Sequence, residues 1–185
     1  MKTIKFLALA IICVFATSAT FAQMDKTVMV GGAAMYPSKN IIENAVNSKD
    51  HTTLVAAVKA AGLVETLEGA GPFTVFAPTN EAFDKLPKGT VETLLKPENK
   101  AMLVSILTYH VVAGKLSSQD LVKMVKDGHG KATLKTVQGG NLYVTQKGNN
   151  LMITDEKGHM AKITIEDVNQ SNGVIHVINT VLLPK

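Results

Sequence analysis

The sequence predicts an α+β fold with an antiparallel sheet, organised as one domain. Between residues 40 and 125 most apolar residues recur with the 3.6-residue period of helices, and after residue 130 they alternate with the period of strands. Helices followed by strands are typical of α+β folds. No segment repeats with a period of about 20 to 50 residues, and 185 residues suit a single domain.

The first 22 residues predict a secretory signal peptide that is not part of the fold. Two lysines begin it, and an apolar run from Phe6 to Ala16 follows. We expect cleavage before Gln23, with cleavage after Ala19 as the alternative, and no lipid anchor. Cys13 lies in the apolar run, so the mature chain would contain no cysteine and would depend on its hydrophobic core.

Charge and aromatic content argue against nucleic-acid binding. Without the two signal-peptide lysines the chain has 17 lysines and 15 acidic residues, and it has no arginine or tryptophan. Nucleic-acid readers usually cluster their charge and depend on arginine, whereas these lysines are scattered. No segment after residue 22 is apolar enough for a membrane span, so no integral span is expected after cleavage.

Helical patterns begin after residues 23–38, which are expected to form a loosely ordered lead-in. A short helix is predicted from Asn40, and a longer one is predicted to end at Gly62. Another short helix is expected before Gly69. The apolar residues of the longer helix recur at i, i+4 and i+7; they are Leu54, Val58 and Ala61.

The next segment predicts a strand between short helices. Phe73–Ala77 reads as a strand that Pro78 ends, because proline cannot extend the hydrogen-bond ladder. Thr79 or Asn80 is expected to cap a short helix, and Thr90 is expected to cap another.

The longest helix is predicted from Pro97 to about Tyr109, since proline is favoured at the first helical position. A strand at Val111–Val112 should follow, and Ser117 with Asp120 resembles a capping box for the next helix. One face of the long helix carries a stripe that we expect to be buried. Its members are Leu103, Ile106, Leu107 and His110.

Strands are predicted in the remainder of the chain. Residues 142–147 and 161–166 alternate between apolar and polar side chains, and Gly139-Gly140 and Asn172-Gly173 mark hairpin turns. Residues 174–178 are apolar on both faces, which predicts a central strand.

Three stretches together resemble the motifs of the fasciclin (FAS1) domain family. They are "GPFTVFAPTNEAFDKL" over Gly71–Leu86, "TYHVVAG" over Thr108–Gly114 and "NGVIHVINTVLLP" over Asn172–Pro184. Their order and spacing also match, and the resemblance covers residues 39–185. The motif residues that we expect to support the fold are Thr74, Phe76, Pro78, Thr79, Asn80, Phe83, His110, Asn172, Gly173 and His176.

The resemblance implies a seven-stranded antiparallel β-wedge or sandwich with several α-helices packed mainly from the N-terminal half. It also implies a secreted or periplasmic cell-envelope protein with an adhesive role. The partner would be a cell-surface or matrix protein or a polysaccharide, and self-association through the wedge is open. Because some algal relatives are associated with carotenoids, a carrier of an apolar small molecule is the alternative function.

Four residues are candidates for contact with a partner. Adhesive animal members carry an aspartate–isoleucine pair before the closing motif, and the matching positions are Asp167 and Val168. Tyr109 and His110 in the central motif are the other two. The family often has aspartate where this chain has Asn179.

Catalysis is not expected. The mature chain has no cysteine, no Gly-x-Ser-x-Gly turn and no His-Glu-x-x-His motif. A metal-dependent hydrolase built on His110 and His176 is the remaining enzyme alternative, but two histidines are fewer than the three protein ligands of a usual catalytic zinc site. We therefore predict no cofactor and no metal. His110 is expected to be buried, hydrogen-bonded and placed at the junction of helix and strand.

Overall fold

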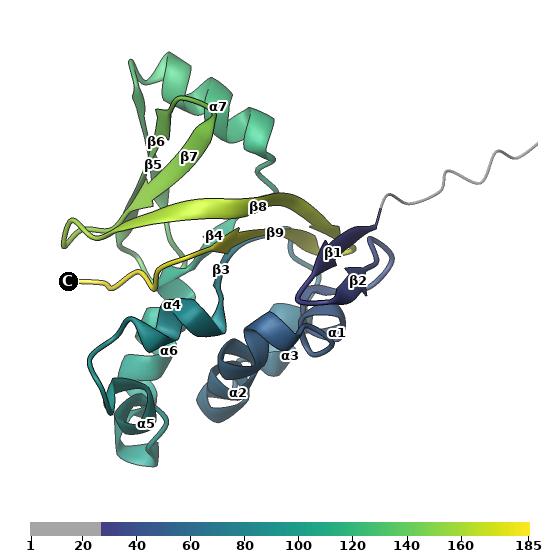
Figure 1. Ribbon diagram of the computed structural model, residues 1–185, viewed down its shortest axis with the longest axis vertical. Helices are drawn as coiled ribbons and strands as arrows, with labels where there is room; N and C mark the ends of the chain where they lie inside the picture. The colour runs from purple at the N-terminus through teal and green to yellow at the C-terminus, as the bar shows by residue number, and fades with distance from the viewer. Residues whose placement is uncertain (1–26) are drawn as a thin grey trace, which may run out of the picture.

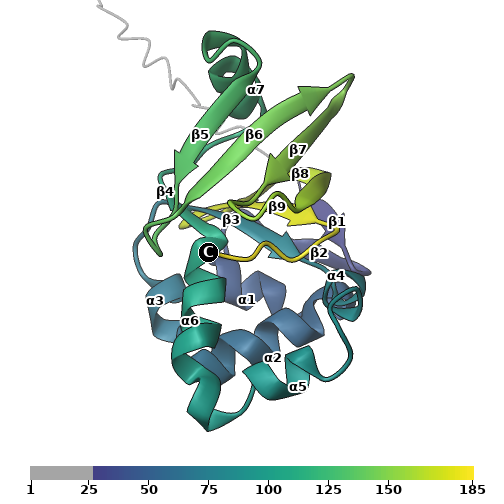
Figure 2. The same ribbon diagram turned by 90° about the vertical axis from the view of Figure 1, so that its left-hand side faces the viewer.

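Residues 27–185 are described by a computed structural model, and the expected signal peptide over residues 1–22 lies outside them. The helices belong mainly to the N-terminal half of the chain. All but the last of them gather on one side of a curved sheet, and the last lies over the curled end of the sheet (Figures 1 and 2). They are α1 (Ile41–Ala45), α2 (Thr52–Ala61), α3 (Val64–Glu68), α4 (Asn80–Asp84), α5 (Thr90–Leu94), α6 (Lys100–Tyr109) and α7 (Ser118–Asp127).

The strands form a small hairpin and a larger sheet. The hairpin pairs β1 (Val28–Val30) with β2 (Ala33–Met35). The seven-stranded sheet has the order β4-β3-β9-β8-β7-β6-β5. Its strands are β3 (Phe73–Pro78), β4 (Val111–Ala113), β5 (Lys131–Lys135), β6 (Asn141–Lys147), β7 (Asn150–Thr154), β8 (Met160–Gln170) and β9 (Gly173–Ile178).

The sheet curls until its first and last strands nearly meet. An antiparallel bridge between Val112 and Thr136 joins β4 to the end of β5. Every pairing is antiparallel except β3 with β9, which run parallel and place Phe73 beside Gly173. The expected antiparallel sheet is therefore correct apart from this pair. A Cβ at position 173 would overlap the Phe73 carbonyl, so glycine is required there for the close approach of the two strands.

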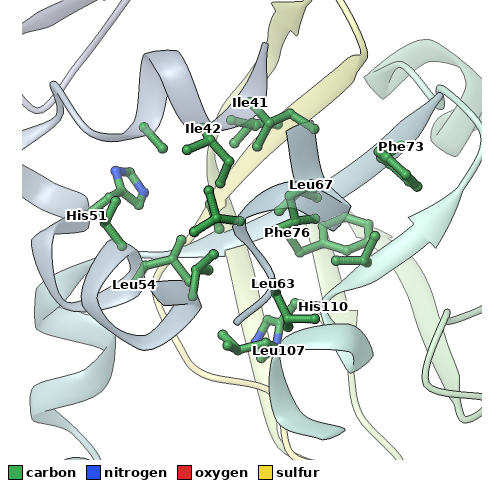
Figure 3. A pocket seen from close by; sticks show the side chains of 18 of the residues that line it. Ile41, Ile42, His51, Leu54, Leu63, Leu67, Phe73, Phe76, Leu107 and His110 are labelled. Atoms are coloured by element: carbon green, nitrogen blue, oxygen red, sulfur yellow. The ribbon is translucent and has the colours of Figure 1, made fainter. Parts of the chain in front are cut away.

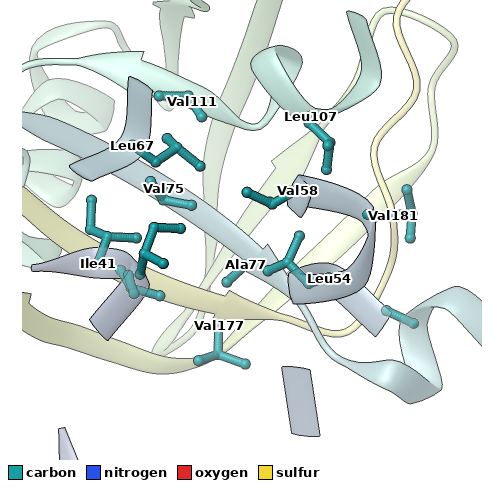
Figure 4. Packing of buried hydrophobic residues seen from close by; sticks show 14 of the residues in the cluster. Ile41, Leu54, Val58, Leu67, Val75, Ala77, Leu107, Val111, Val177 and Val181 are labelled. Carbon is teal, nitrogen blue, oxygen red and sulfur yellow. The ribbon is translucent and has the colours of Figure 1, made fainter. Parts of the chain in front are cut away.

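Two apolar clusters fill the interior. One lies between the helices and the sheet, where Leu54 and Val58 of α2 face Val75 and Ala77 of β3 (Figure 4). The other fills the curled part of the sheet beneath α7 and includes Leu121. The apolar β9, predicted to be central, is buried along its whole length between β3 and β8.

Local structure differs from the sequence-based expectations at three places. Residues 28–35 of the expected loosely ordered lead-in form the β1–β2 hairpin, whose turn is Gly31-Gly32 with both φ angles positive. Gly89, not Thr90, occupies the N-cap of α5. Pro97 begins a 3₁₀ turn, so α6 starts only at Lys100 and is no longer than α2 or α7.

Candidate functional site

The histidine of the central motif is a buried link between α6 and the C-terminal segment. His110 is the C-cap of α6 and only 3% exposed. Its Nδ1 lies 2.8 Å from the Ile106 carbonyl, and its Nε2 accepts the Leu182 N–H at 3.0 Å. Because a carbonyl only accepts and an N–H only donates, the ring is neutral with its proton on Nδ1. Burial lowers the pKa of His110 to about 4.

Tyr109 has a similar position in the other apolar cluster. It is 0% exposed, and its hydroxyl donates to the Asn141 carbonyl at 2.7 Å. The same oxygen accepts the Glu156 N–H at 3.1 Å. Burial raises the pKa of Tyr109 to about 12. Both residues of the Tyr-His motif are therefore occupied inside the fold, which leaves neither as part of an exposed contact surface.

His176 in β9 joins the closing motif to two other segments. Its Nε2 donates to the Leu116 carbonyl at 2.9 Å, and its Nδ1 accepts the Asp167 N–H at 3.3 Å. The ring stacks on Phe76 with 5.8 Å between centroids. Burial lowers the pKa of His176. His176 is thus a second buried, neutral and fully hydrogen-bonded imidazole.

Asp167 and Val168 differ sharply in their surroundings. Val168 is 1% exposed and packs in the helix-side core. Asp167 is half-buried, and a register shift in β8 accompanies its left-handed backbone with φ of 56°. Its carboxylate accepts the Ser118 N–H at 2.7 Å and the Ser118 hydroxyl at 2.5 Å. Asp167 therefore fixes the N-terminus of α7, where a carboxylate is favourable, and the pair does not form an exposed recognition element.

Polar side chains in the first and third motifs hold backbone segments together. Asn172 accepts the Ile41 N–H at 3.1 Å and donates to the carbonyls of Leu67 and Gly69 at 2.7 and 2.9 Å. It thus connects α1 and α3 to the turn before β9. Thr79 is the N-cap of α4 and accepts the Ala82 N–H.

Asn80 and Thr74 make the same kind of link. Asn80 accepts the Thr53 N–H at 3.0 Å and donates to the Lys49 carbonyl at 2.8 Å, which fixes the start of α2. Thr74 donates to the Gly114 carbonyl at 2.7 Å and accepts the Leu116 N–H at 2.9 Å. The apolar motif residues, which are Phe76, Pro78 and Phe83, are buried.

An apolar cavity lies between the helices and β3. Its volume is about 80 Å³, and its walls include Ile42, Leu54 and Val75. Figure 3 shows His51 on one side of it and His110 on another, with apolar side chains between them. Pockets that hold drug-sized ligands measure about 300–1,000 Å³. The cavity is therefore too small to enclose a carotenoid-like molecule, and the geometry does not favour the carrier alternative in that form.

His51 was not singled out by the sequence, and no spacing pattern marks it. The residue is 4% exposed at the start of α2, and its Nδ1 lies 2.9 Å from the Ser48 hydroxyl. Its Nε2 is buried without a hydrogen-bond partner in the described structure. Burial lowers the pKa of His51, while the Ala77 carbonyl and the Asp50 carboxylate act in the opposite direction.

An open polar groove lies between α7 and the β6–β7 hairpin, beside the Ser118–Asp167 contact. Its volume is about 330 Å³. Its polar side chains come from three elements and the hairpin turn; they are Ser118, Gln119, Lys123, Lys126, Gln146, Asn149 and Glu166. Only the hydroxyl of Ser118 among them is engaged in a side-chain hydrogen bond within residues 27–185. Sequence periodicity could not identify this groove, because its residues are ordinary solvent-facing positions of a helix and two strands.

Residues 27–185 contain no cluster of three or more histidine, cysteine, aspartate or glutamate side chains arranged to hold a metal ion. None of the helices in the same part of the chain has the length and apolar character needed to cross a membrane.

Comparison with known proteins confirms the resemblance that the motifs suggested. The family model described as Fasciclin domain matches residues 49–184. Protein sll1483 from Synechocystis is 43% identical over 99% of this chain and 96% of its own length. Cell surface glycolipoprotein MPB83 from Mycobacterium bovis is 38% identical over 84% of this chain and 64% of its own length.

A solved structure shares the fold. It is the FAS1 domain pair from the insect cell adhesion molecule Fasciclin I, with a TM-score of 0.72 and 21% identity, covering 80% of this chain and 52% of that one. The expected FAS1 architecture, with helices packed on a nearly closed seven-stranded sheet, is therefore confirmed.

Proposed function

Because the chain belongs to the fasciclin domain family, we propose that it is an exported, non-catalytic binding module that attaches to an acidic polysaccharide of the cell surface or matrix. Export is supported by the signal peptide expected over residues 1–22. An adhesive role is supported by the relatives, one of which is named a cell surface glycolipoprotein and another a cell adhesion molecule.

The groove beside α7 is the observation that carries this proposal. The polar side chains of the fasciclin motifs form hydrogen bonds within the fold, as the bonds of His110, His176 and Asn172 to backbone groups illustrate. The groove instead presents amides, amines and a carboxylate with free hydrogen-bonding capacity. A surface that binds a partner needs polar groups that are not already hydrogen-bonded within the fold, and the buried motif residues offer no such groups.

The chemistry of the groove fits an acidic sugar polymer. The amides of Gln119, Gln146 and Asn149 suit sugar hydroxyls, because each amide offers both donors and acceptors. Lys123 and Lys126 lie on the same face of α7 at i and i+3, and they can pair with carboxylates on successive sugars. Two lysines against the single carboxylate of Glu166 give the groove a positive balance.

A protein partner is supported less well. The residues that dominate binding energy at protein interfaces are enriched in tryptophan, tyrosine and arginine. The chain contains no tryptophan or arginine, and the lining of the groove includes no aromatic residue. Charge pairing with a polymer does not require such anchors.

The test measures binding of the purified protein to immobilised polyuronate, with neutral dextran as the reference polymer. We expect binding to polyuronate that weakens with added salt, because surface ion pairs are screened within about 8 Å at physiological ionic strength. The double variant Lys123→Gln/Lys126→Gln should lower the affinity by about tenfold. Lys88 and Lys96 are exposed near α5, far from α7 in Figure 1, and Lys88→Gln/Lys96→Gln is the matched control.

Three outcomes contradict the proposal. Equal binding to dextran and polyuronate would show that charge does not matter. Equal losses in the two double variants would show that the groove does not bind the polymer. Capture of an envelope protein that depends on Lys123 and Lys126, without polyuronate binding, would replace the polysaccharide by a protein partner.

A further inference from the structure

The outer face of the curled sheet carries lysines that are far apart in the sequence. They belong to β5, β6 and β8 and are Lys131, Lys135, Lys147 and Lys162. In Figure 2 none of the described helices lies in front of β5, β6 and β7. The last helix, α7, covers the opposite face, where its Leu121 packs in the core of the curl. These strands therefore present one uncovered face to solvent.

Strand pairing shows which side chains share this outer face. Directly paired residues lie on the same face of an antiparallel sheet. One row across β5, β6, β7 and β8 consists of Lys131, Thr145, Met152 and Lys162, and the next row consists of Thr133, Tyr143, Thr154 and Met160. The first row therefore has a lysine at each end and a methionine between them.

The charge of the outer face is positive. Its outward positions in these two rows hold lysine, threonine, tyrosine and methionine but no acidic residue. The Glu156 carboxylate lies at one end of the face, where it accepts hydrogen bonds from the N–H and the side-chain amide of Asn141 at 3.2 and 3.1 Å. The neighbouring Asp155 is buried. Within residues 27–185 the lysines of the outer face form no ion pair, so their charge is available to an anionic partner.

The middle of the outer face is partly apolar. Tyr143 and Met152 are half-buried, and Met160 is 49% exposed. The ammonium group of Lys131 lies 3.9 Å from the centre of the Tyr143 ring, which is a cation–π contact. Lysine can lay its methylene groups along an apolar surface while its ammonium group reaches a polar layer. The face thus combines apolar side chains with cations at their border.

We propose that this outer face docks the protein on a bilayer that contains anionic phospholipids. The lysines attract the anionic headgroups, while Tyr143, Met152 and Met160 enter the boundary between headgroups and acyl chains. Tyrosine is enriched at this boundary, and the unbranched methionine side chain adapts to an irregular surface. An acidic polymer fits this face less well, because the two central rows lack the side-chain amides that line the groove beside α7.

This membrane contact goes beyond the polysaccharide binding proposed above, because it uses a separate surface. The groove and the outer face share no residue. Gln146 and Leu151, which line the groove, alternate along β6 and β7 with the outward-facing Thr145 and Met152. A chain that lies on a membrane through its outer face therefore keeps the groove open to a polymer.

Co-sedimentation with vesicles tests the role of charge. The vesicles contain equal parts of phosphatidylglycerol and phosphatidylcholine, with pure phosphatidylcholine as the reference. Each lysine near an anionic surface strengthens binding by about fivefold. Lys131→Gln/Lys162→Gln should therefore weaken binding to the mixed vesicles by about twentyfold. Lys88→Gln/Lys96→Gln removes the same charge near α5 and is the matched control, which should change binding by about twofold or less.

Methionine methyl groups identify the face that touches lipid. The wild-type chain, labelled with ¹³C at these methyl groups, is mixed with small bicelles of the same two lipids and a nitroxide-labelled phosphatidylcholine. The NMR signals of Met152 and Met160 should broaden. The signal of Met102, which is 57% exposed on α6, is the internal control and should stay sharp.

The proposal is overturned if neutral and mixed vesicles bind the protein equally, if the two double variants lose the same affinity, or if Met102 broadens as much as Met152 and Met160. Polyuronate binding that depends on Lys131 and Lys162, without binding to vesicles, would replace the membrane by an acidic polymer. The NMR experiment uses the wild-type chain and remains decisive even if Lys131→Gln/Lys162→Gln fails to fold. Failure of the polysaccharide proposal is recognised separately, because Lys123→Gln/Lys126→Gln alters the groove and leaves the two rows of the outer face intact.

Discussion

Acidification from pH 6.5 towards pH 4 should destabilise this protein through His110. Nε2 accepts the Leu182 N–H, so a proton added to Nε2 would place two donors against each other. The pKa of His110 is held at about 4 in the folded state by burial, against 6.5 for an ordinary histidine. The unfolded chain therefore binds more protons than the folded chain between these two values, and stability falls as the pH is lowered from 6.5 towards 4.

The magnitude follows from the difference between the two pKa values. At about 1.36 kcal/mol for each pKa unit, the interval from 6.5 to about 4 corresponds to a total loss of about 3 kcal/mol. Between pH 7.5 and pH 5.0 the same linkage gives about 2 kcal/mol from His110 alone. His176 and His51 act in the same direction, because burial lowers their pKa values as well.

Urea unfolding followed by far-ultraviolet circular dichroism at pH 7.5, 6.0 and 5.0 measures this loss. His110→Gln should be less stable than the wild type at pH 7.5, because it disrupts two buried hydrogen bonds, but its free energy of unfolding should fall by about 2 kcal/mol less on acidification. His129→Asn is the matched control, since His129 is exposed at a left-handed position that asparagine tolerates. The reasoning is refuted if His110→Gln and the wild type lose the same free energy between pH 7.5 and 5.0.

Two substitutions test the other links that hold the fold together. Asn172→Ala should lower the free energy of unfolding by about 3 kcal/mol or more, because it leaves the Leu67 and Gly69 carbonyls and the Ile41 N–H without their partner. The exposed Asn149 is the control, and Asn149→Ala should change this free energy by about 0.5 kcal/mol or less. Equal effects of the two substitutions in urea unfolding would contradict the role of Asn172. Asp167→Ala should lower the free energy of unfolding by about 2 kcal/mol through loss of the Ser118 contacts. Asp167→Asn should lower it less, because asparagine keeps an acceptor and tolerates φ of 56°. Equal loss of stability in the two variants would show that the Ser118 contact is unimportant.

Local features of the fold could be predicted because they depend on neighbours in sequence. Gly62 ends α2 with a left-handed φ of 73°, and Ser117 with Asp120 forms a capping box at α7. The β1–β2 hairpin could also have been predicted, since Gly31-Gly32 separates two short apolar runs. Gly31, Gly32 and Pro37 also favour irregular structure, and this is the basis on which a loosely ordered lead-in is expected.

Long-range features could not be predicted in the same way. The parallel pairing of β3 with β9 joins residues about 100 positions apart, and neither strand's pattern specifies a direction. The role of Asp167 depends on a register shift in β8 that turns its carboxylate towards α7. His51 became notable only through what its Nε2 lacks, and a missing partner leaves no trace in the sequence.

The motifs that identify the family therefore have little direct bearing on what this chain binds. Polar side chains of the motifs form hydrogen bonds with backbone groups of distant segments, as His110, His176, Asn172 and Thr74 do. A backbone N–H or C=O offers the same hydrogen bond whatever residue carries it. Such residues can be shared by relatives that bind different partners, because the fold alone requires them. Under the function proposed above, specificity comes from positions that the motifs leave free, such as Lys123 and Lys126 on α7. Lys123→Gln/Lys126→Gln should therefore weaken polymer binding while leaving the free energy of unfolding within about 0.5 kcal/mol of the wild type.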